Sequence, residues 1–292
     1  MRSADTTTTA VPEATRRHES FMAYSRFFYL KIALALAVAS VVLYAIDRPY
    51  GSGYGGSWAG YTLGTVGALL ILWLTWYGYH KRRYANIRAG LASQLSAHVY
   101  LGLALLVVAT LHTGFHFGWN VHTLAYVLMC VVIASGVFGV FCYARFPRLM
   151  TENRAGMTMQ QMLGRIASLD DELRLAALPL DHATATVIER STETNVIGGS
   201  VRRQLSGRLR GCTTEAAIAY LYAKGMEVPA EIEDTWRRVR VLLEEKGLLL
   251  NRVRRDISYK AMMDVWLYLH VPIAMMLLVA LFAHIFSVFF LW

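Results

Sequence analysis

Two pairs of histidines occur with the same spacing in two apolar segments of the sequence. His98 and His112 lie fourteen positions apart in one segment, and His270 and His284 are spaced identically in another. Fourteen residues make almost four turns of an α-helix, so the members of each pair should share one helix face, about 21 Å apart. Ionisable residues inside apolar spans are rare and are functional candidates. Because imidazole is a common metal ligand, the pattern indicates metal or haem ligation at two depths.

Five apolar segments are long enough to carry these histidines across a bilayer core of about 30 Å. The sequence is 55% hydrophobic and only 17% charged, whereas a soluble domain is typically about 25% charged. We expect spans near residues 28–46, 59–79, 95–117, 121–143 and 265–292. The histidine pairs fall in the third and fifth spans, which run in the same direction. His98 and His270 should therefore share the inner level, and His112 and His284 the outer level.

The predicted fold class is an all-α integral membrane protein, with a five-transmembrane-helix bundle and an inserted, mostly helical cytoplasmic domain between spans four and five. Apolar residues at helical spacing predict helices near 159–177, 213–223 and 229–250 of the insert. The expected division is a disordered cytoplasmic tail over 1–26, transmembrane helices one to four over 27–143, the cytoplasmic helical domain over 144–264, and transmembrane helix five over 265–292.

The distribution of charge predicts the orientation. The sequence has a net charge of +9, with 29 Lys and Arg residues, and all of these except Arg48 lie in the N-terminal segment, the loop after span two or the insert. The positive-inside rule assigns those regions to the cytoplasm, so a nucleic-acid partner is not expected. The basic run Arg202, Arg203, Arg208 and Arg210 could face anionic lipid or an acidic redox partner. Three scattered cysteines exclude a disulfide framework and a zinc site of the usual spacing.

Small residues beside the inner histidines favour haem as the ligand. Gly102 follows His98 by four residues and Ala274 follows His270 by four, which leaves room for a flat porphyrin. Leu105 and Leu277 then occupy matching positions between the two levels. Two imidazoles at each depth predict two bis-His haems. A metal or proton-relay site, or histidines that serve only in packing, are the alternatives.

On these residues the sequence resembles the di-haem cytochrome b membrane subunits of bacterial electron-transfer chains. The segments that carry the resemblance are His98 with Leu111-His112-Thr113-Gly114-Phe115-His116, Trp266-Leu267-Tyr268-Leu269-His270, and Ala283-His284. They are also similar to the ferric-reductase-like transmembrane domain. The resemblance implies two b-type haems with the axial ligands His98, His112, His270 and His284. Ferric reductases and NADPH oxidases continue into flavin and nicotinamide domains, whereas this sequence ends at Trp292, so we expect its electron donor to be a separate partner.

The expected function is transmembrane electron transfer between a quinone pool and a partner redox subunit that carries haem c, iron–sulfur or flavin. The expected location is the bacterial inner (plasma) membrane, in contact with lipid. A self-contained transmembrane ferric or other metal reductase that acts at the outer haem is the alternative. A histidine-based transporter or proton channel and a purely structural scaffold are further alternatives from other classes.

Several further residues lie near the expected haem levels. His116 should lie one helical turn beyond His112, and His122 opens span four. These two could contact a propionate, line a quinol pocket, bind a further haem or simply face lipid headgroups. Arg82, Arg83, Arg88 and Lys260 are candidates to pair with propionates of the inner haem. The closely spaced glycines Gly60, Gly64, Gly67, Gly136 and Gly139 indicate tight helix packing, and Trp266 is expected in the aromatic belt of the membrane interface.

Overall fold

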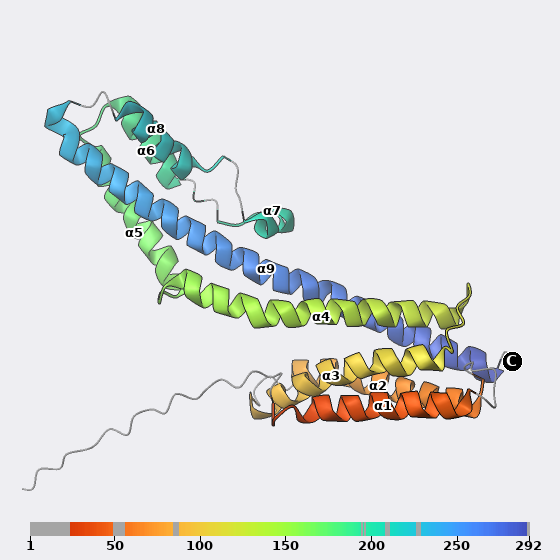
Figure 1. Ribbon diagram of the computed structural model, residues 1–292. Coiled ribbons are helices and arrows are strands. Elements are labelled where there is room, and N and C mark those ends of the chain that lie inside the picture. The colour runs from red at the N-terminus through yellow and green to blue at the C-terminus, as the bar shows by residue number, and fades with distance from the viewer. Residues whose placement is uncertain are drawn as a thin grey trace, which may run out of the picture. The chain divides into compact units, whose positions relative to one another are not determined.

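The computed structural model describes residues 24–48, 56–83, 88–193, 195, 197–207, 211–225 and 229–290, and all regular structure in these ranges is helical (Figure 1). The helices are α1 (Phe28–Asp47), α2 (Trp58–Arg83), α3 (Arg88–His112), α4 (Val121–Arg154), α5 (Met159–Ala177), α6 (His182–Glu193), α7 (Val201–Ser206), α8 (Thr213–Lys224), the short 3₁₀ helix η2 (Ala230–Ile232) and α9 (Glu233–Phe290). Five helices, α1, α2, α3, α4 and α9, contain segments long and apolar enough to cross a membrane. Within the described residues, the predicted number of long apolar segments and their helical structure are thereby confirmed.

The contacts within the chain divide it into two compact units, which are described separately. Unit 1 comprises residues 1–133 and 274–292, and unit 2 comprises residues 134–273. The first part of α4 and the last part of α9 belong to unit 1, and the remainder of both helices belongs to unit 2. The expected tail over 1–26 lies almost wholly outside the described residues, as do Arg208 and Arg210.

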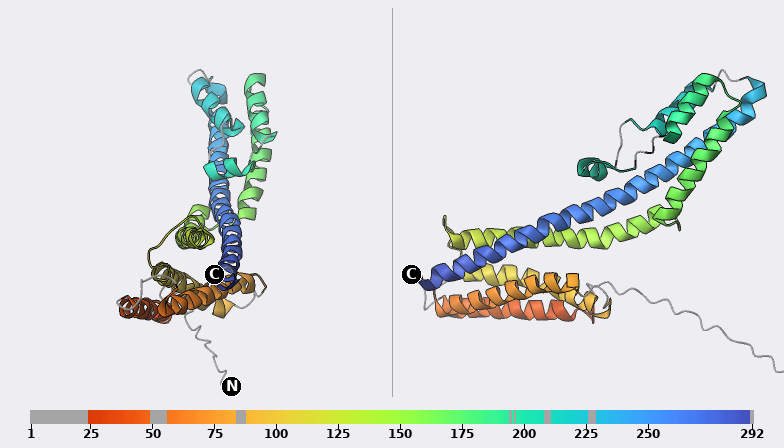
Figure 2. Two further views of the ribbon diagram at one scale, coloured as in Figure 1. Left: turned by 90° about the vertical axis from the view of Figure 1, so that its right-hand side faces the viewer. Right: turned by 180° about the vertical axis from the view of Figure 1, so that it is seen from behind.

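Unit 1 is built around α3, which packs against both α1 and α2 (Figure 2). The Tyr29 hydroxyl on α1 and the Ser93 hydroxyl on α3 are hydrogen-bonded at 2.9 Å. The buried core of the unit draws on α2, α3, α4 and α9, through Ile71, Leu105, Met129, Leu277 and Leu281. The two leucines that were expected between the histidine levels, Leu105 and Leu277, therefore share one core.

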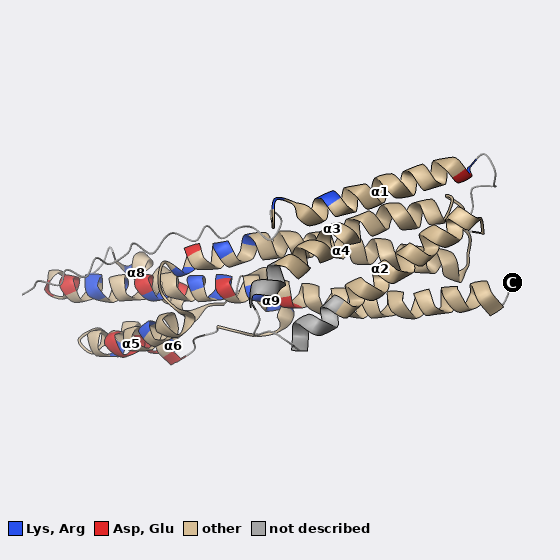
Figure 3. Ribbon diagram, turned by 90° about the horizontal axis from the view of Figure 1, so that it is seen from below, with Lys and Arg blue, Asp and Glu red and all other residues tan. Residues whose placement is uncertain are grey.

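Charged residues are concentrated on the helices of unit 2, whereas few residues on the described parts of α1, α2 and α3 are coloured as charged in Figure 3. Large apolar side chains such as Val38, Leu69 and Val279 are exposed on unit 1. Helices with all their backbone hydrogen bonds satisfied internally and with apolar outer faces are suited to lipid. The described helices are thus compatible with a multi-pass membrane protein.

Two helices extend beyond the expected ends of spans four and five. Helix α4 continues through Pro147 to Arg154, and α9 is one helix of 58 residues that includes Pro272, about 87 Å long at 1.5 Å per residue. The expected domain boundaries at 143/144 and 264/265 consequently lie inside continuous helices. Within unit 2, Arg154, the last residue of α4, forms an ion pair with buried Asp256 of α9 at 2.6 Å.

Unit 2 has its own apolar core, formed mainly by α5, α6, α8 and α9. Helix α5 has the bounds that its apolar stripe predicts, and Met162, Ile166, Leu169 and Leu173 of that stripe are buried. Leu163, which was expected on the same face, is exposed. Helices α6 and α7 were not expected from the sequence, and α6 packs against α5 and α8.

Asp181 caps the N-terminus of α6, and its charge should contribute to the stability of unit 2. Its carboxylate accepts hydrogen bonds from the Thr184 hydroxyl at 2.7 Å and from Lys224 Nζ at 3.0 Å, and these contacts lower its pKa to about 2. A carboxylate with a lowered pKa stabilises the fold above its unfolded-state pKa, and this contribution disappears as the pH falls through about 2. Asp181→Ala should therefore destabilise the protein by about 1 kcal/mol at pH 7.

Thermal unfolding of the purified chain in detergent, followed by circular dichroism at several pH values, measures this effect. The difference between Asp181→Ala and the unaltered protein should shrink as the pH falls from 4 toward about 2, whereas Asp181→Asn, which keeps a capping oxygen, should be milder at pH 7. A difference that is the same at both ends of that pH range would contradict the assignment of charge to this cap.

Candidate functional site

Three histidines meet within unit 1, and we refer to His112, His122 and His284 as the histidine cluster. His112 is the last residue of α3, His122 lies in the first turn of α4, and His284 lies near the end of α9. The ring centroids of His112 and His284 are 5.9 Å apart, and those of His122 and His284 are 4.6 Å apart. The ring of His284 is nearly perpendicular to both neighbours, at 86° and 88°. The two predicted outer histidines are thus side by side.

The side chain of His112 packs against helix α2. His112 Nδ1–H donates a hydrogen bond to the Gly60 carbonyl of α2 at 2.8 Å. One turn further along α2, a Cβ atom at Gly64 would lie only 2.7 Å from His112 Cε1. A metal-binding histidine usually donates its other ring N–H to a carboxylate, a carbonyl or water. Because Nδ1 of His112 is engaged in this way, Nε2 is the nitrogen available for a ligand.

The spacing of the cluster assigns different roles to its members. Two imidazoles that bind one metal ion from opposite sides have ring centroids about 6 Å apart, because each metal–nitrogen bond is about 2 Å long. The His112–His284 separation of 5.9 Å matches this requirement, whereas the His122–His284 separation of 4.6 Å is too short. His122 instead engages His284 through a hydrogen bond between their Nδ1 atoms. His112 and His284 are therefore the candidate ligand pair, and His122 supports one of them.

The loop after α3 places His116 differently from the sequence-based expectation. Helix α3 ends at His112, because Gly114 and Phe115 adopt positive φ angles of 55° and 64°. His116 is consequently not on the helix face of His112, and its side chain is exposed. Of the two secondary histidines, the structure brings only His122 to the candidate ligands.

His270 has a comparable setting in unit 2. Its Nδ1 is hydrogen-bonded to the Ser135 hydroxyl of α4 at 2.6 Å. Trp266 Nε1–H donates to the Ser135 carbonyl at 2.7 Å, and its ring lies 5.3 Å from that of His270. An added Cβ at Gly139 would meet the Trp266 ring at 2.1 Å, so close packing at this glycine is confirmed. Trp266 is therefore a packing and hydrogen-bonding partner near His270, a role that the aromatic-belt interpretation did not include.

His98 and its neighbours on α3 lie in unit 1, whereas His270 lies in unit 2, so the pairing of His98 with His270 stays a prediction. His98 is half-buried on α3. A Cβ added at Gly102 would meet no heavy atom within 4 Å, which leaves space for a flat group on this side of α3. Ala274 is half-buried on α9.

The basic candidates for propionate partners remain predictions. Arg82 and Arg83 end α2 and Arg88 begins α3, but their side chains lie outside the described part of the structure. Lys260 is exposed on α9 within unit 2.

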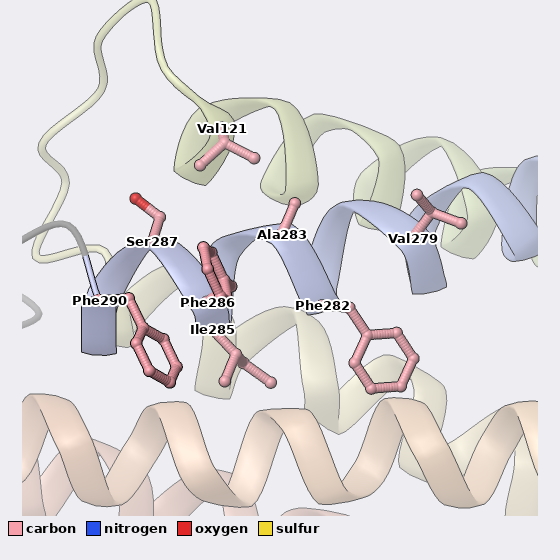
Figure 4. A pocket seen from close by; sticks show the side chains of 8 residues that line it. All are labelled: Val121, Val279, Phe282, Ala283, Ile285, Phe286, Ser287 and Phe290. Carbon is pink, nitrogen blue, oxygen red and sulfur yellow. The ribbon is translucent and has the colours of Figure 1, made fainter.

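An open apolar groove of about 830 Å³ lies along the end of α9, and its lining includes sequence neighbours of His122 and His284 (Figure 4). Seven of the eight lining residues are apolar, and Ser287 is the polar one; the lining consists of Val121, Val279, Phe282, Ala283, Ile285, Phe286, Ser287 and Phe290. Ala283 and Ile285 flank His284 in the sequence, and Val121 precedes His122. Sites for apolar cofactors are lined predominantly by such side chains, so the surroundings of His284 are suited to a hydrophobic ligand.

The residues around His112 and His284 fit a haem with two axial imidazoles. The ring separation is right, Nδ1 of each histidine is engaged by the protein, and the adjacent groove is apolar. No group of three or more His, Cys, Asp or Glu side chains among the described residues is arranged to hold a metal ion on its own. Haem requires only one or two axial side chains from the protein.

Gly64 is the residue whose substitution should disturb the cluster most directly. The Cβ of Gly64→Ala would lie 2.7 Å from His112 Cε1, so the imidazole must move or α2 and α3 must separate, and overpacking of this kind costs about 1–3 kcal/mol. Gly67→Ala is the matched control, because its Cβ would meet Leu105 at an ordinary 3.7 Å. Thermal unfolding in detergent should show a lower midpoint for Gly64→Ala only. Equal midpoints for the two variants would contradict this packing.

Comparison of the chain with protein-family models, with curated proteins and with solved structures found no match.

Proposed function

We propose that this chain is a membrane cytochrome b that transfers electrons across the bilayer through two bis-His b-type haems. The observation that carries the proposal is the His112–His284 pair, with ring centroids 5.9 Å apart and with Nδ1 of each ring engaged by the protein. The identical spacing of the two histidine pairs along the sequence supports a second haem at His98 and His270.

Each part of the chain has a defined task in this proposal. When bound, haem iron supplies the one-electron redox couple, and the protein sets its potential through axial ligands, hydrogen bonds and burial. The Gly60 carbonyl and the Ser135 hydroxyl orient His112 and His270 through Nδ1. Leu105 and Leu277 belong to the buried apolar core of unit 1, and burial of this kind would help to set the potential of a haem bound at His112 and His284.

The partners and orientation follow from the charge distribution and from the resemblance to di-haem cytochrome b subunits. We propose that the N-terminus and residues 144–264 face the cytoplasm of a bacterial inner membrane, because all but one of the basic residues would then be on that side. Electrons would be exchanged between a quinone and a partner subunit that carries haem c, iron–sulfur or flavin.

The test is an optical spectrum of the full chain purified in mild detergent. The dithionite-reduced minus oxidised spectrum should show the Soret and α bands of low-spin b-type haem, and the haem content should be two per chain. A chain that carries no haem after expression with an adequate haem supply would overturn the proposal and favour a histidine relay or a scaffold.

A further inference from the structure

We propose that His122 is a positioning residue for His284: it accepts a hydrogen bond from His284 Nδ1–H and thereby directs Nε2 of His284 toward the side of His112. The inference rests on the proposed function, because it concerns how one axial ligand is held. It assigns to His122 a role distinct from ligation, propionate binding and quinol binding.

The proposed binding of iron by His284 Nε2 fixes the direction of this interaction. A neutral imidazole has one N–H donor and one acceptor nitrogen. If His284 Nε2 is to bind iron, its Nδ1 must carry the proton, so Nδ1 of His122 is the acceptor in the bond between them. His122 is then held as its Nε2–H tautomer. The separation of 4.6 Å between the two rings is too short for His122 and His284 to bind one metal ion from opposite sides.

Hydrogen bonds at the start of α4 fix the position of His122 relative to His284. Asn120 caps the helix, because its Oδ1 accepts a hydrogen bond from the Thr123 backbone N–H at 2.9 Å. The Thr123 hydroxyl in turn accepts from the Gly118 backbone N–H at 3.0 Å. The Tyr126 hydroxyl, one turn after His122, is hydrogen-bonded to the Thr110 hydroxyl of α3 at 3.0 Å. Hydrogen bonds within the start of α4 and between α4 and α3 thus hold the backbone that carries His122.

An acceptor on the distal nitrogen of an axial histidine has a predictable electronic effect. It raises the basicity of the imidazole, which stabilises ferric more than ferrous iron and lowers the midpoint potential. Removal of the acceptor should therefore raise the midpoint of the haem at His112 and His284, while the haem at His98 and His270 is unaffected.

Redox titration of His122→Leu, with both haems bound in detergent, tests this inference. One of the two midpoints should rise, so that the ratio of reduced to oxidised haem at a fixed potential increases severalfold; a tenfold change corresponds to about 59 mV for one electron. The electron paramagnetic resonance signal of the same ferric haem should also change, because its axial ring is no longer held. His122→Gln, whose side-chain carbonyl can accept the same hydrogen bond, should restore most of the original midpoint.

Two further variants separate the outcomes. In a His112→Leu background, where one haem is absent, His122→Leu should leave the remaining midpoint unchanged. Ser135→Ala, which removes the partner of His270 Nδ1, should shift only the other haem. An unchanged midpoint and resonance signal in His122→Leu, or loss of a haem in both His122→Leu and His122→Gln, would overturn the positioning role. Absence of haem from the unaltered chain would instead refute the proposed function.

Discussion

Replacement of His112 by leucine should reduce the haem content of the purified chain from two haems to one. Leucine retains the apolar volume at the end of α3 but removes the imidazole whose ring lies 5.9 Å from that of His284. His284→Leu should have the same effect, because both side chains are proposed to bind one iron. A pyridine haemochrome assay against protein concentration, together with the reduced spectrum, measures the loss.

The control for this experiment is His116→Leu. His116 follows His112 closely in the sequence, but it lies in the loop after α3 with an exposed side chain, so this variant should keep two haems. His98→Leu and His270→Leu should each remove the other haem. Two haems in His112→Leu, or a loss of haem in His116→Leu, would contradict the ligand assignment.

Replacement of Lys246 by methionine should destabilise unit 2 strongly. The Lys246 side chain is 0% exposed and that of Asp170 is 8% exposed, and the two form an ion pair at 2.6 Å. Lys246 also donates to the Ser191 carbonyl, and Asn195 donates to the second oxygen of Asp170 at 2.6 Å. Loss of one partner leaves the other charge buried and unpaired, which costs about 3–5 kcal/mol.

The double variant Asp170→Asn/Lys246→Met is the matched comparison. It contains no buried charge at this position, and the side-chain carbonyl of the introduced asparagine can still accept from Asn195, so most of the lost stability should return. Chemical unfolding of the full chain in detergent, for both single variants and the double variant, gives the coupling between the two residues. A double variant as unstable as the sum of the single variants would show that the pair is not coupled.

Much of the fold could be predicted because the length of the apolar segments and the helical spacing of apolar residues can be read from the sequence. The start of α1 at Phe28, the start of α4 at Val121 and both ends of α5 agree with the sequence. Helix α6 was missed because its sequence is rich in threonine, which favours helices weakly, and its stability comes from the burial of Ile188 in the core of unit 2. The end of α4 and the start of α9 were misplaced because prolines and charges usually end helices, whereas α4 continues past Pro147 to Arg154, which pairs with Asp256 of α9.

The candidate ligands could also be found from the sequence, but their partners could not. The interval of fourteen residues places the two histidines of each pair on one face of their helix, and this follows without any tertiary information. Gly60 and Ser135, by contrast, are far along the chain from His112 and His270, to which they are hydrogen-bonded. The glycine spacings did signal close packing, but not that the partner packed against Gly64 is an imidazole.

The sequence by itself determined that this protein has five apolar helices and that four histidines recur on two of them, because both properties depend only on residues near in the chain. The tertiary structure alone decided which nitrogen of His112 is engaged, that His122 rather than His116 is hydrogen-bonded to His284, and that Lys246 is buried with Asp170. These features depend on contacts between distant segments, whose geometry is fixed only when the helices pack.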